Sequence, residues 1–209
     1  MSVTRKYKVL FLCRDNSARS IIAEALLREL AGHRFEAFSA GPDPVARVHP
    51  DAIAQLRPGI SDHRVLSPKS WLEFTGEWAP RMDLVIAMDE FVDEHHAPVF
   101  PGEPAFRHWT FADPLAGHVD NAERVRLFDK VFWQIVRQVS SFIESPQYAL
   151  LMQDTPGRNG ASEPDGVPRL DENLASRLAG RIGECHDDAV HGCAGSSGHD
   201  AQRVDTADA

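Results

Sequence analysis

The chain has 209 residues, 43% of them hydrophobic, which is enough to bury one substantial core, and this length predicts one domain followed by a tail. Asp and Glu number 31 against 22 Lys and Arg, so the formal net charge is −9. This balance argues against a protein that binds nucleic acid or anionic membranes over a broad surface. Any anion that the protein binds must instead be held by local geometry.

The start of the chain and its cysteines indicate a cytoplasmic protein. Residues 1–7 carry basic side chains, but the apolar run over residues 9–12 is too short for a signal-peptide core or a membrane span. The three cysteines, Cys13, Cys185 and Cys193, do not form a dense disulfide framework, and their odd number leaves at least one thiol free.

The first predicted elements are a strand and a helix. Residues 8–13 are a continuous apolar run, which is typical of a strand buried on both faces of a parallel sheet. Residues 20–30 are predicted to form a helix, because Ile22, Leu26 and Leu30 recur at four-residue steps and make one stripe that packs on the sheet. The charged residues of this segment fall elsewhere on the helical wheel.

A second strand and a short helix follow. The strand is predicted over residues 35–40 and is closed by Gly41. The helix is predicted over residues 49–56 and is ended by Pro58 and Gly59, since glycine and proline commonly end regular structure.

The remaining pattern completes an α/β fold. One or two helical turns are predicted over residues 68–74, a buried strand over 83–88 and a strand of mixed character over 106–111. Apolar residues at three- and four-residue steps predict a long amphipathic helix over residues 121–143, which Pro146 ends. We therefore expect a single domain with a parallel four-stranded sheet flanked by helices, whose sites lie at the carboxyl ends of the strands.

The end of the chain differs in composition. It is rich in Gly, Asp, Ser and Pro, which predicts a tail over residues 147–209 that is largely disordered, after a catalytic domain over residues 1–146. The tail has one four-residue apolar repeat that predicts at most a marginal helix, formed by Leu170, Leu174, Leu178 and Ile182.

Residues 13–20, Cys-Arg-Asp-Asn-Ser-Ala-Arg-Ser, lie between the first strand and the first helix and form a candidate phosphate-binding loop. A tight turn before a helix directs backbone N–H groups and the helix dipole at a bound oxyanion. The same field predicts a lowered pKa for Cys13, which would make it a nucleophile at neutral pH. Arg19 supplies a planar fork for two oxygens, and Ser20 can donate a hydrogen bond to the thiolate. A buried structural cysteine is the alternative, but the strand before and the helix after favour the functional interpretation.

Four stretches, residues 9–20, 39–41, 86–89 and 112–114, resemble the low-molecular-weight protein tyrosine phosphatase superfamily, which includes arsenate reductases of the same fold. The resemblance covers about residues 7–145 and leaves the tail uncovered. It implies the same α/β fold and a reaction that begins with a thiolate attacking a phosphate-like oxyanion.

The resemblance also implies roles for individual residues. Cys13 would be the nucleophile, Arg19 and the loop amides would bind the oxyanion, Asn16 would pin the loop, and Asp113 would be the general acid. The remaining positions with an implied oxyanion-binding or supporting role are Ser17, Ala18 and Ser20. Taken alone, an Asp before Pro114 is more readily explained by turn chemistry, but the presence of the thiolate loop favours the acid role.

Two loop residues depart from the family pattern. Arg14 and Asp15 stand where smaller or uncharged residues are usual. Asp15 can adopt a left-handed backbone conformation, but its charge opposes an incoming dianion unless Arg14 or another cation offsets it. Substrate preference therefore depends on how these two charges are placed.

The second step of the reaction distinguishes arsenate reduction from phosphate ester hydrolysis. A phosphatase needs only water, whereas arsenate reduction needs a second thiol to attack the cysteine adduct. In thioredoxin-coupled reductases that thiol follows the third strand, but residues 88–99 contain no cysteine here. An internal relay at that place is therefore absent from the sequence.

We expect an arsenate reductase that uses an external thiol such as glutathione, mycothiol or a glutaredoxin-like protein. Leu115 follows the Asp-Pro pair, where the phosphatases often have tyrosine. A low-molecular-weight tyrosine phosphatase acting on phosphomonoesters or phosphotyrosine is the close alternative. A non-catalytic phosphate-binding module is a third, and the presence of Cys13 and Asp113 argues against it. Further segments that resemble the reductase branch are residues 63–64, 67–74, 98–104 and 108–109.

No bound cofactor or metal is expected. The adjacent His95 and His96 are more typical of an exposed polar segment, and the Cys and His spacings of the tail match no standard zinc pattern. These tail residues are Cys185, His186, His191, Cys193 and His199. Four aromatic side chains are expected in the core or in a pocket wall: Trp71, Trp78, Trp109 and Phe111.

Overall fold

The computed structural model describes residues 5–57, 59–60, 63–90, 92 and 97–145. All of them belong to the first of two compact units, residues 1–165. The predicted tail over residues 147–209 lies outside the described residues, so the domain boundary at residue 146 stays a prediction. None of the helices in the described part of the chain is long and apolar enough to cross a membrane.

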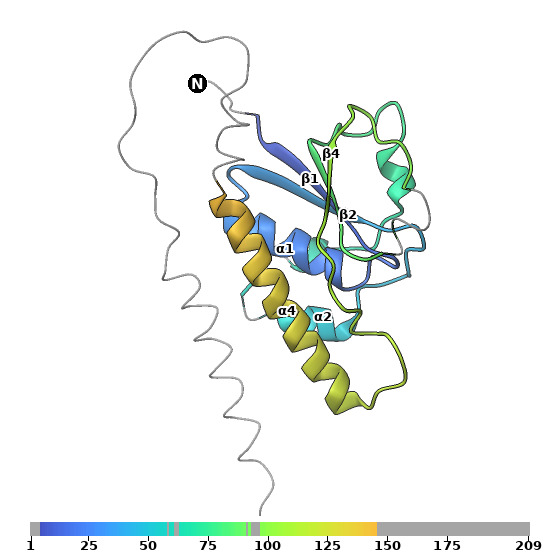
Figure 1. The fold of residues 1–209 in the computed structure, drawn as a ribbon, viewed down its shortest axis with the longest axis vertical. Coiled ribbons are helices and arrows are strands. Elements are labelled where there is room, and N and C mark those ends of the chain that lie inside the picture. Colours follow the sequence, from blue (N-terminus) through green and yellow to red (C-terminus); the bar gives the residue numbers. More distant parts are fainter. Residues whose placement is uncertain (1–4, 58, 61–62, 91, 93–96, 146–209) are drawn as a thin grey trace, which may run out of the picture. The chain divides into compact units, whose positions relative to one another are not determined.

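The centre of the fold is a four-stranded parallel sheet (Figure 1). Its order is β2-β1-β3-β4, so β1 is paired on both sides. This arrangement confirms the predicted fold class. The strands are β1 (Tyr7–Leu12), β2 (Phe35–Ala40), β3 (Leu84–Ala87) and β4 (Ala105–His108).

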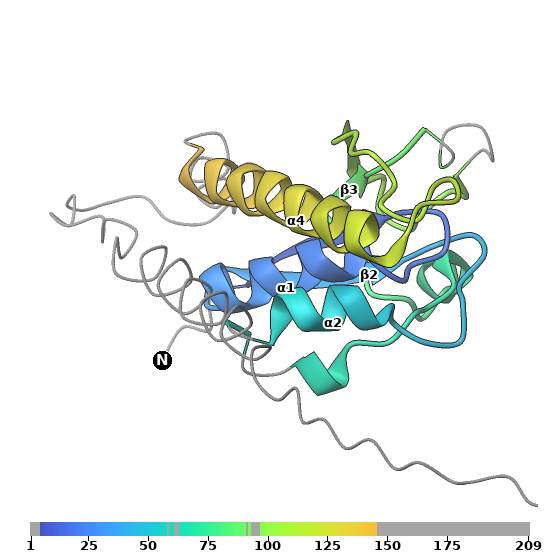
Figure 2. The ribbon, with the colours of Figure 1, turned by 90° about the horizontal axis from the view of Figure 1, so that it is seen from below.

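Helices cover the sheet and give it two buried faces. Helix α1 contacts β1 and β2 and also packs on α2 and α4, and Figure 2 shows these three helices lying side by side. On the other face, Leu10 and Leu12 of β1 pack in a cluster with Trp71 and Phe74. The helical elements are α1 (Arg19–Ala31), α2 (Pro50–Leu56), η1 (His63–Val65), η2 (Trp71–Phe74) and α4 (Asn121–Glu144).

The buried strands follow directly from the sequence pattern. Val9 to Leu12 and Leu84 to Ala87 are at most 1% exposed, as a continuous apolar run predicts for strands covered on both faces. Successive side chains of a strand point to opposite faces, so every residue of such a run finds a core. The long helix α4 also agrees with its predicted bounds, although Val125 at its first turns is 44% exposed.

Three elements differ from the sequence-based expectation. The fourth strand is Ala105–His108, four residues exposed at the edge of the sheet, because only β3 pairs with it. Residues 68–74 contain one 3-10 turn, capped by the side chain of Ser70. Helix α1 is buried nearly all round rather than along one stripe, and Glu24 is 1% exposed.

The parallel register brings the loops after three strands to one edge of the sheet. Leu12 pairs with Ala40 of β2 and with Ala87 of β3, so the chain leaves all three strands at the same level. Gly41 permits the close approach, because a Cβ there would lie 2.4 Å from the carbonyl oxygen of Cys13 and 2.5 Å from that of Arg14. The predicted loop therefore sits where the topology of parallel sheets places binding sites.

Candidate active site

The loop over residues 13–18 follows the end of the central strand β1, and its shape is held from outside. The backbone amides of residues 43–49, a segment that we call the clasp, donate to its carbonyl oxygens. Because these carbonyls are turned outward, the loop amides between them face the opposite way. The contacts are Asp43 N to Arg14 O at 3.1 Å, Val45 N to Asp15 O at 3.1 Å and His49 N to Ser17 O at 2.9 Å.

The inner amides of the loop are available for an anion. Among the described residues, no acceptor is found for the backbone N–H groups of Asn16, Ser17 and Ala18. Ala18 is the N-cap of α1 and gives no side-chain cap, whereas the side chain of Asp120 caps α4. Uncapped amides at a helix N-terminus bind negative charge, so this loop has the donors of an oxyanion site.

Cys13 lies at the base of the loop and its side chain is fully buried. Its Sγ is 2.8 Å from the Oγ of Ser20. The Nδ2 of Asn16 donates to the same hydroxyl oxygen at 2.8 Å, which leaves the hydroxyl hydrogen of Ser20 for the sulfur. Asn16 also accepts from the backbone amide of Lys69 through Oδ1 at 2.7 Å, so it ties the loop to a neighbouring segment.

The backbone of Asn16 explains why an asparagine suits this place. Its φ is 46°, in the left-handed region that Asn and Asp enter more readily than other non-glycine residues. We expected Asp15 to be able to take this conformation, but the structure gives it to the next residue. Ser17 is buried, and its hydroxyl donates to the Oδ2 of Asp15 at 2.9 Å.

The pKa of Cys13 differs in direction from the sequence-based expectation. Burial raises the pKa of the thiol above its ordinary value, while the charge of Arg19 and hydrogen bonds from Ser20 lower it and the charge of Asp15 raises it further. The prediction of a lowered pKa considered the helix end and the cation. The sequence does not reveal that the sulfur of Cys13 is entirely buried, and burial disfavours the thiolate.

Arg19 is paired with two carboxylates. Its Nη2 is 2.9 Å from the Oδ2 of Asp89 and 3.2 Å from the Oδ2 of Asp113, and its Nη1 donates to the carbonyl of Phe111 at 3.2 Å. The other oxygen of Asp113 accepts from the amide of Leu115 at 3.0 Å. The structure thus brings together the three residues for which catalytic roles were expected, although Asp113 and Cys13 are far apart in the sequence.

Asp89 is the site residue that the sequence analysis did not single out. It follows the end of β3, accepts from the backbone amide of Arg14 at 3.0 Å and pairs with Arg19. One signal was present, since Asp89 ends the stretch 86–89 that carries the family resemblance. Because Asp89 follows a predicted buried strand, the sequence could have placed it at the sheet edge where the loop after β1 lies.

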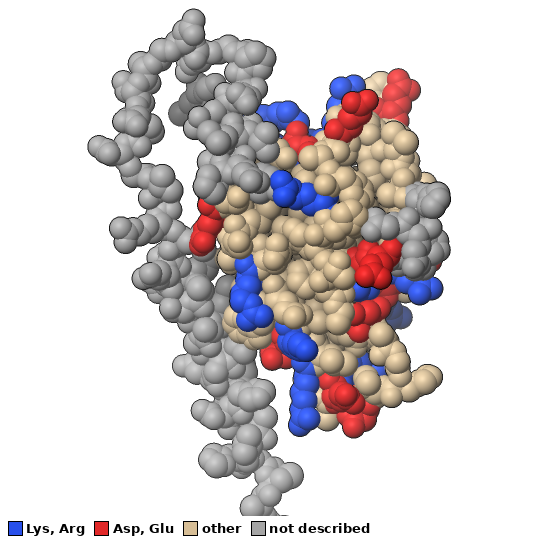
Figure 3. Space-filling model, viewed as in Figure 1, with Lys and Arg blue, Asp and Glu red and all other residues tan. Residues whose placement is uncertain are grey.

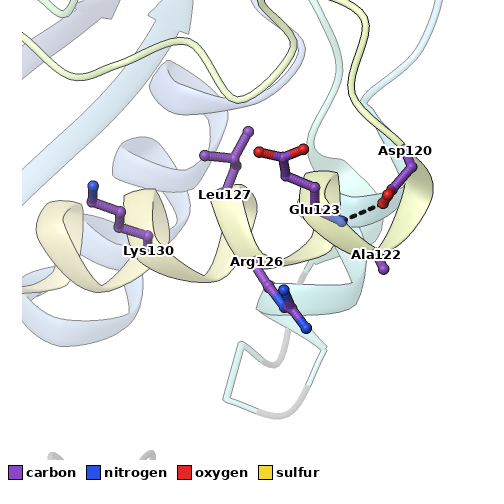
Figure 4. Close-up of a pocket in the computed structure, with 6 residues that line it drawn as sticks. All are labelled: Asp120, Ala122, Glu123, Arg126, Leu127 and Lys130. Atoms are coloured by element: carbon purple, nitrogen blue, oxygen red, sulfur yellow. Dashed lines mark hydrogen bonds between the residues drawn. The ribbon is translucent and has the colours of Figure 1, made fainter.

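Two further surface features lie outside the loop: the distribution of charge and a hollow along α4. Figure 3 shows basic and acidic side chains interspersed on the face in view, with no extended area of one sign. A hollow of about 490 Å³ lies along the first turns of α4, where the N-cap Asp120 accepts from the amide of Glu123 (Figure 4). It contains none of the expected site residues, and its lining is Asp120, Ala122, Glu123, Arg126, Leu127 and Lys130.

The possible metal ligands and the aromatic residues named from the sequence lie in different parts of the chain. Within the described residues, no group of three or more His, Cys, Asp or Glu side chains could hold a metal ion. His95, His96 and the Cys and His residues of the tail lie outside that part. Trp71 and Trp109 are buried as expected, but Trp78 is 93% exposed and belongs to no core.

Comparisons with known proteins assign the chain to one family. A family model described as low molecular weight phosphotyrosine protein phosphatase matches residues 8–149. The arsenate reductase of Halalkalibacterium halodurans is 28% identical over 144 residues, which are 67% of this chain and 97% of that protein.

Two solved structures have the same fold. An arsenate reductase in the phosphate binding state has a TM-score of 0.51 and 26% identity over 66% of this chain and 96% of its own. The tyrosine phosphatase Wzb from Escherichia coli K30, in complex with sulphate, has a TM-score of 0.52 and 22% identity over 67% of this chain and 98% of its own. Because the family model matches more than half of the sequence, the chain belongs to the low molecular weight phosphotyrosine protein phosphatase family.

Proposed function

We propose that this protein is an arsenate reductase, which converts arsenate to arsenite through an adduct on Cys13 and a thiol supplied from outside the catalytic domain. The observation that carries the proposal is the similarity to the Halalkalibacterium halodurans arsenate reductase, which extends over 97% of that protein. A loop of inward amides that ends at Arg19 beside a buried Cys13 is consistent with this chemistry.

In the first step, the thiolate of Cys13 attacks arsenic and forms a sulfur–arsenic bond. The loop amides and the guanidinium of Arg19 bind the remaining oxygens, where charge builds in the transition state. Asp113 gives a proton to the leaving oxygen, which departs as water. Arsenic stays in the +5 state in this adduct, so no electrons have yet been transferred.

In the second step, another thiol attacks the sulfur of Cys13. A disulfide forms, the sulfur–arsenic bond breaks, and its electron pair goes to arsenic, which leaves as arsenite in the +3 state. The two thiols lose the two electrons that arsenic gains. A further thiol reduces the mixed disulfide and restores Cys13.

The second thiol is proposed to be external. Cys13 is the one cysteine among the described residues, since Cys185 and Cys193 fall in the tail. The donors that fit are glutathione, mycothiol or a glutaredoxin-like protein. We also place the enzyme in the cytoplasm, because there a free catalytic thiol is kept reduced.

Phosphatase activity is the second candidate, and the same lack of a second thiol in the described domain favours it. A phosphocysteine needs only water for its hydrolysis, with Asp113 as the acid for the leaving phenolic oxygen and then as the base for water. The loop geometry serves both reactions, because phosphate and arsenate are tetrahedral oxyanions of the same charge type.

A side-by-side assay tests the proposal. Arsenate reduction is measured with glutathione plus a glutaredoxin, with mycothiol and with thioredoxin, and hydrolysis of an aryl phosphate is measured on the same protein. We expect arsenite with at least one donor, and Cys13→Ser should abolish it while inorganic phosphate still binds, since the amides remain. Aryl phosphate hydrolysis without any arsenate reduction would identify a phosphatase instead. Phosphate binding without either reaction would identify a binding module.

A further inference from the structure

We propose that Asp89 is a positioning residue, which holds the guanidinium of Arg19 and the first loop amide in the geometry that an oxyanion needs. The inference rests on the proposed role of the loop as an oxyanion site, but not on which oxyanion is the substrate. A single oxygen of Asp89, Oδ2, accepts from the amide of Arg14 at 3.0 Å and lies 2.9 Å from the Nη2 of Arg19. The carboxylate therefore joins Arg14, which follows Cys13 in the loop, to Arg19, the first residue of α1.

Asp89 is fixed by the fold independently of Arg19. Strand β3 runs parallel to β1 in a register that pairs Ala87 with Leu12, and the amide of Met88 donates to the carbonyl of Leu12 at 2.8 Å. Asp89 follows Met88 directly and therefore lies beside the loop that begins after Leu12. The second oxygen of Asp89, Oδ1, accepts from the amide of Val92 at 3.3 Å. Two backbone amides thus hold the carboxylate in place.

The chemistry of guanidinium shows why this contact affects oxyanion binding. An arginine offers two bidentate forks, one formed by Nε and Nη2 and the other by Nη1 and Nη2. Both forks use Nη2, which lies 2.9 Å from the Oδ2 of Asp89 and 3.2 Å from the Oδ2 of Asp113 in this structure. A bidentate contact from Arg19 to an oxyanion therefore requires one of the two carboxylates to leave Nη2.

Burial and anchoring decide which carboxylate leaves. The side chain of Asp113 is 36% exposed, and its other contact is the amide of Leu115 within its own turn. The side chain of Asp89 is 11% exposed and is bound by two amides, that of Val92 in its own segment and that of Arg14 in the loop. Asp113 can leave Nη2 with its own turn intact, whereas Asp89 cannot without losing both amides. The oxyanion then takes the contact to Nη2 that Asp113 gives up. Asp113 stays at the edge of the site to protonate the leaving oxygen, and Asp89 keeps Arg19 aligned.

A double-mutant cycle tests this role. Asp89→Asn keeps the shape of the side chain and an oxygen for one of the two amides, but it removes the charge that orients the fork and leaves the other amide facing an NH2 group. Arg19→Lys keeps the positive charge but has no fork to orient. Asp89→Asn also removes the repulsion between Asp89 and the substrate and can affect the fold, but these two effects should be similar with Arg19 and with Lys at position 19. The difference between the effects of Asp89→Asn in the two backgrounds therefore measures how much Asp89 orients the guanidinium of Arg19.

We expect Asp89→Asn to lower kcat about 10- to 100-fold in the Arg19 enzyme and less than about 3-fold in the Arg19→Lys enzyme, because effects of groups that act as a unit are not additive. The matched control is Asp83→Asn, at the opposite end of β3. Asp83 likewise accepts from a backbone amide, that of Lys8 at 2.8 Å, and pairs with an arginine, Arg5 at 2.6 Å. Its replacement should leave kcat unchanged in both backgrounds.

The unaltered protein and the three variants of the cycle are also titrated with inorganic phosphate by calorimetry. This measurement separates the failure of the inference from the failure of the proposed function, because it needs neither arsenate turnover nor a thiol donor. We expect the effect of Asp89→Asn on phosphate affinity to differ at least about 5-fold between the two backgrounds. Equal effects in both backgrounds, in kcat or in affinity, would overturn the role and make Asp89 structural. If Asp89→Asn does not fold, Asp89→Glu is used in the same cycle, since one added methylene misplaces the carboxylate, and the same criteria apply.

Discussion

Cys13 is the residue where burial and charge act in opposite directions. Its side chain is fully buried, which raises the pKa of the thiol, and the nearby Arg19 and Ser20 lower it only in part. Asp15 adds a negative charge that raises the pKa further. The loop therefore contains one side chain that opposes the thiolate and could be replaced without removing a proposed catalytic group.

Asp15→Asn should make Cys13 more reactive at neutral pH, because a neutral amide of the same shape replaces that negative charge. In the unliganded protein burial raises the pKa of the Cys13 thiol, so alkylation of the unaltered protein should keep rising with pH through the ordinary thiol range near roughly 8.5. With Cys185 and Cys193 changed to Ser, we expect iodoacetamide to react about 3- to 10-fold faster at pH 7 in Asp15→Asn. The measurement is the alkylation rate against pH.

The control for this experiment is Asp129→Asn on α4. Asp129 is exposed and is not among the groups that act on the thiol of Cys13. Its pH profile should coincide with that of the unaltered protein. If the profile of Asp15→Asn coincides with it as well, the charge of Asp15 does not govern the thiol.

Asp113 is predicted to act as the acid for the leaving oxygen, because the structure places it against Arg19 at the edge where the loop opens. Asp113→Asn should slow hydrolysis of aryl phosphates with poor leaving groups by about 10²–10⁴, the usual contribution of a general acid. Esters whose leaving group needs no proton should be slowed much less. The measurement is kcat/KM over a series of leaving groups, with Asp120→Asn at the cap of α4 as the control. A loss that does not vary over the series would indicate a structural role.

At the scale of elements, Gly41 determines how closely the end of β2 approaches the loop. Gly41→Ala should displace backbone rather than a flexible side chain, since the added Cβ would lie 2.4 Å from the carbonyl oxygen of Cys13. We expect a loss of about 1–3 kcal/mol in the free energy of unfolding, as for other overpacked sites. Phosphate affinity should fall about 10- to 100-fold, because small displacements of positioned groups have effects of that size.

Gly76→Ala is the matched control for this substitution. A Cβ at Gly76 would meet no atom within 4 Å. Urea unfolding and phosphate titration should both be close to those of the unaltered protein. Normal phosphate affinity in Gly41→Ala would mean that the loop does not depend on this approach.

Elements with a regular apolar pattern could be predicted from the sequence, and features that depend on contacts between segments could not. Residues 9–12 and 84–87 are apolar without interruption, which is typical of strands covered on both faces. Glu24 shows the limit of helical periodicity. It is buried in α1 because Arg28 and Lys69 pair with it and the hydroxyl of Ser39 donates to it, and two of these partners come from other segments.

The candidate site shows the same limit. Cys13, Arg19 and Asp113 were predicted from a motif and a resemblance, and the sheet topology accounts for their meeting. The pairing of Arg19 with Asp89 depends on the register between β1 and β3, which no local pattern encodes. The pKa of Cys13 depends on complete burial by the surrounding chain, which is likewise a property of the whole fold.

At the scale of the whole molecule, the tail is the remaining source of thiols. Cys185 and Cys193 are tethered to the domain, and tethering can give an effective concentration on the order of millimolar when the linker spans the distance. The composition predicts that this segment is largely disordered, and such a segment would have no preorganised approach to a buried sulfur. We therefore expect a protein truncated after Pro146 to keep its arsenate reduction with a small thiol.

The tail experiment needs a full-length comparison. A Cys185→Ser, Cys193→Ser double variant tests the thiols without removing the tail, and thermal unfolding checks that both proteins are equally stable. Activity lost in both would make the tail the internal thiol relay and contradict an external donor. Activity lost only on truncation would show that the tail supports the fold rather than the chemistry.

The clasp affects how the sequence of the loop can evolve. Its three hydrogen bonds join backbone amides of residues 43–49 to backbone carbonyls of the loop, and every amino acid has a carbonyl. Substitutions at loop positions 14 and 15 can therefore alter the charge around the substrate while the loop keeps its shape. Arg14 and Asp15, the two departures from the usual pattern, occupy positions whose contacts with the clasp are made by the backbone and do not depend on the side chain.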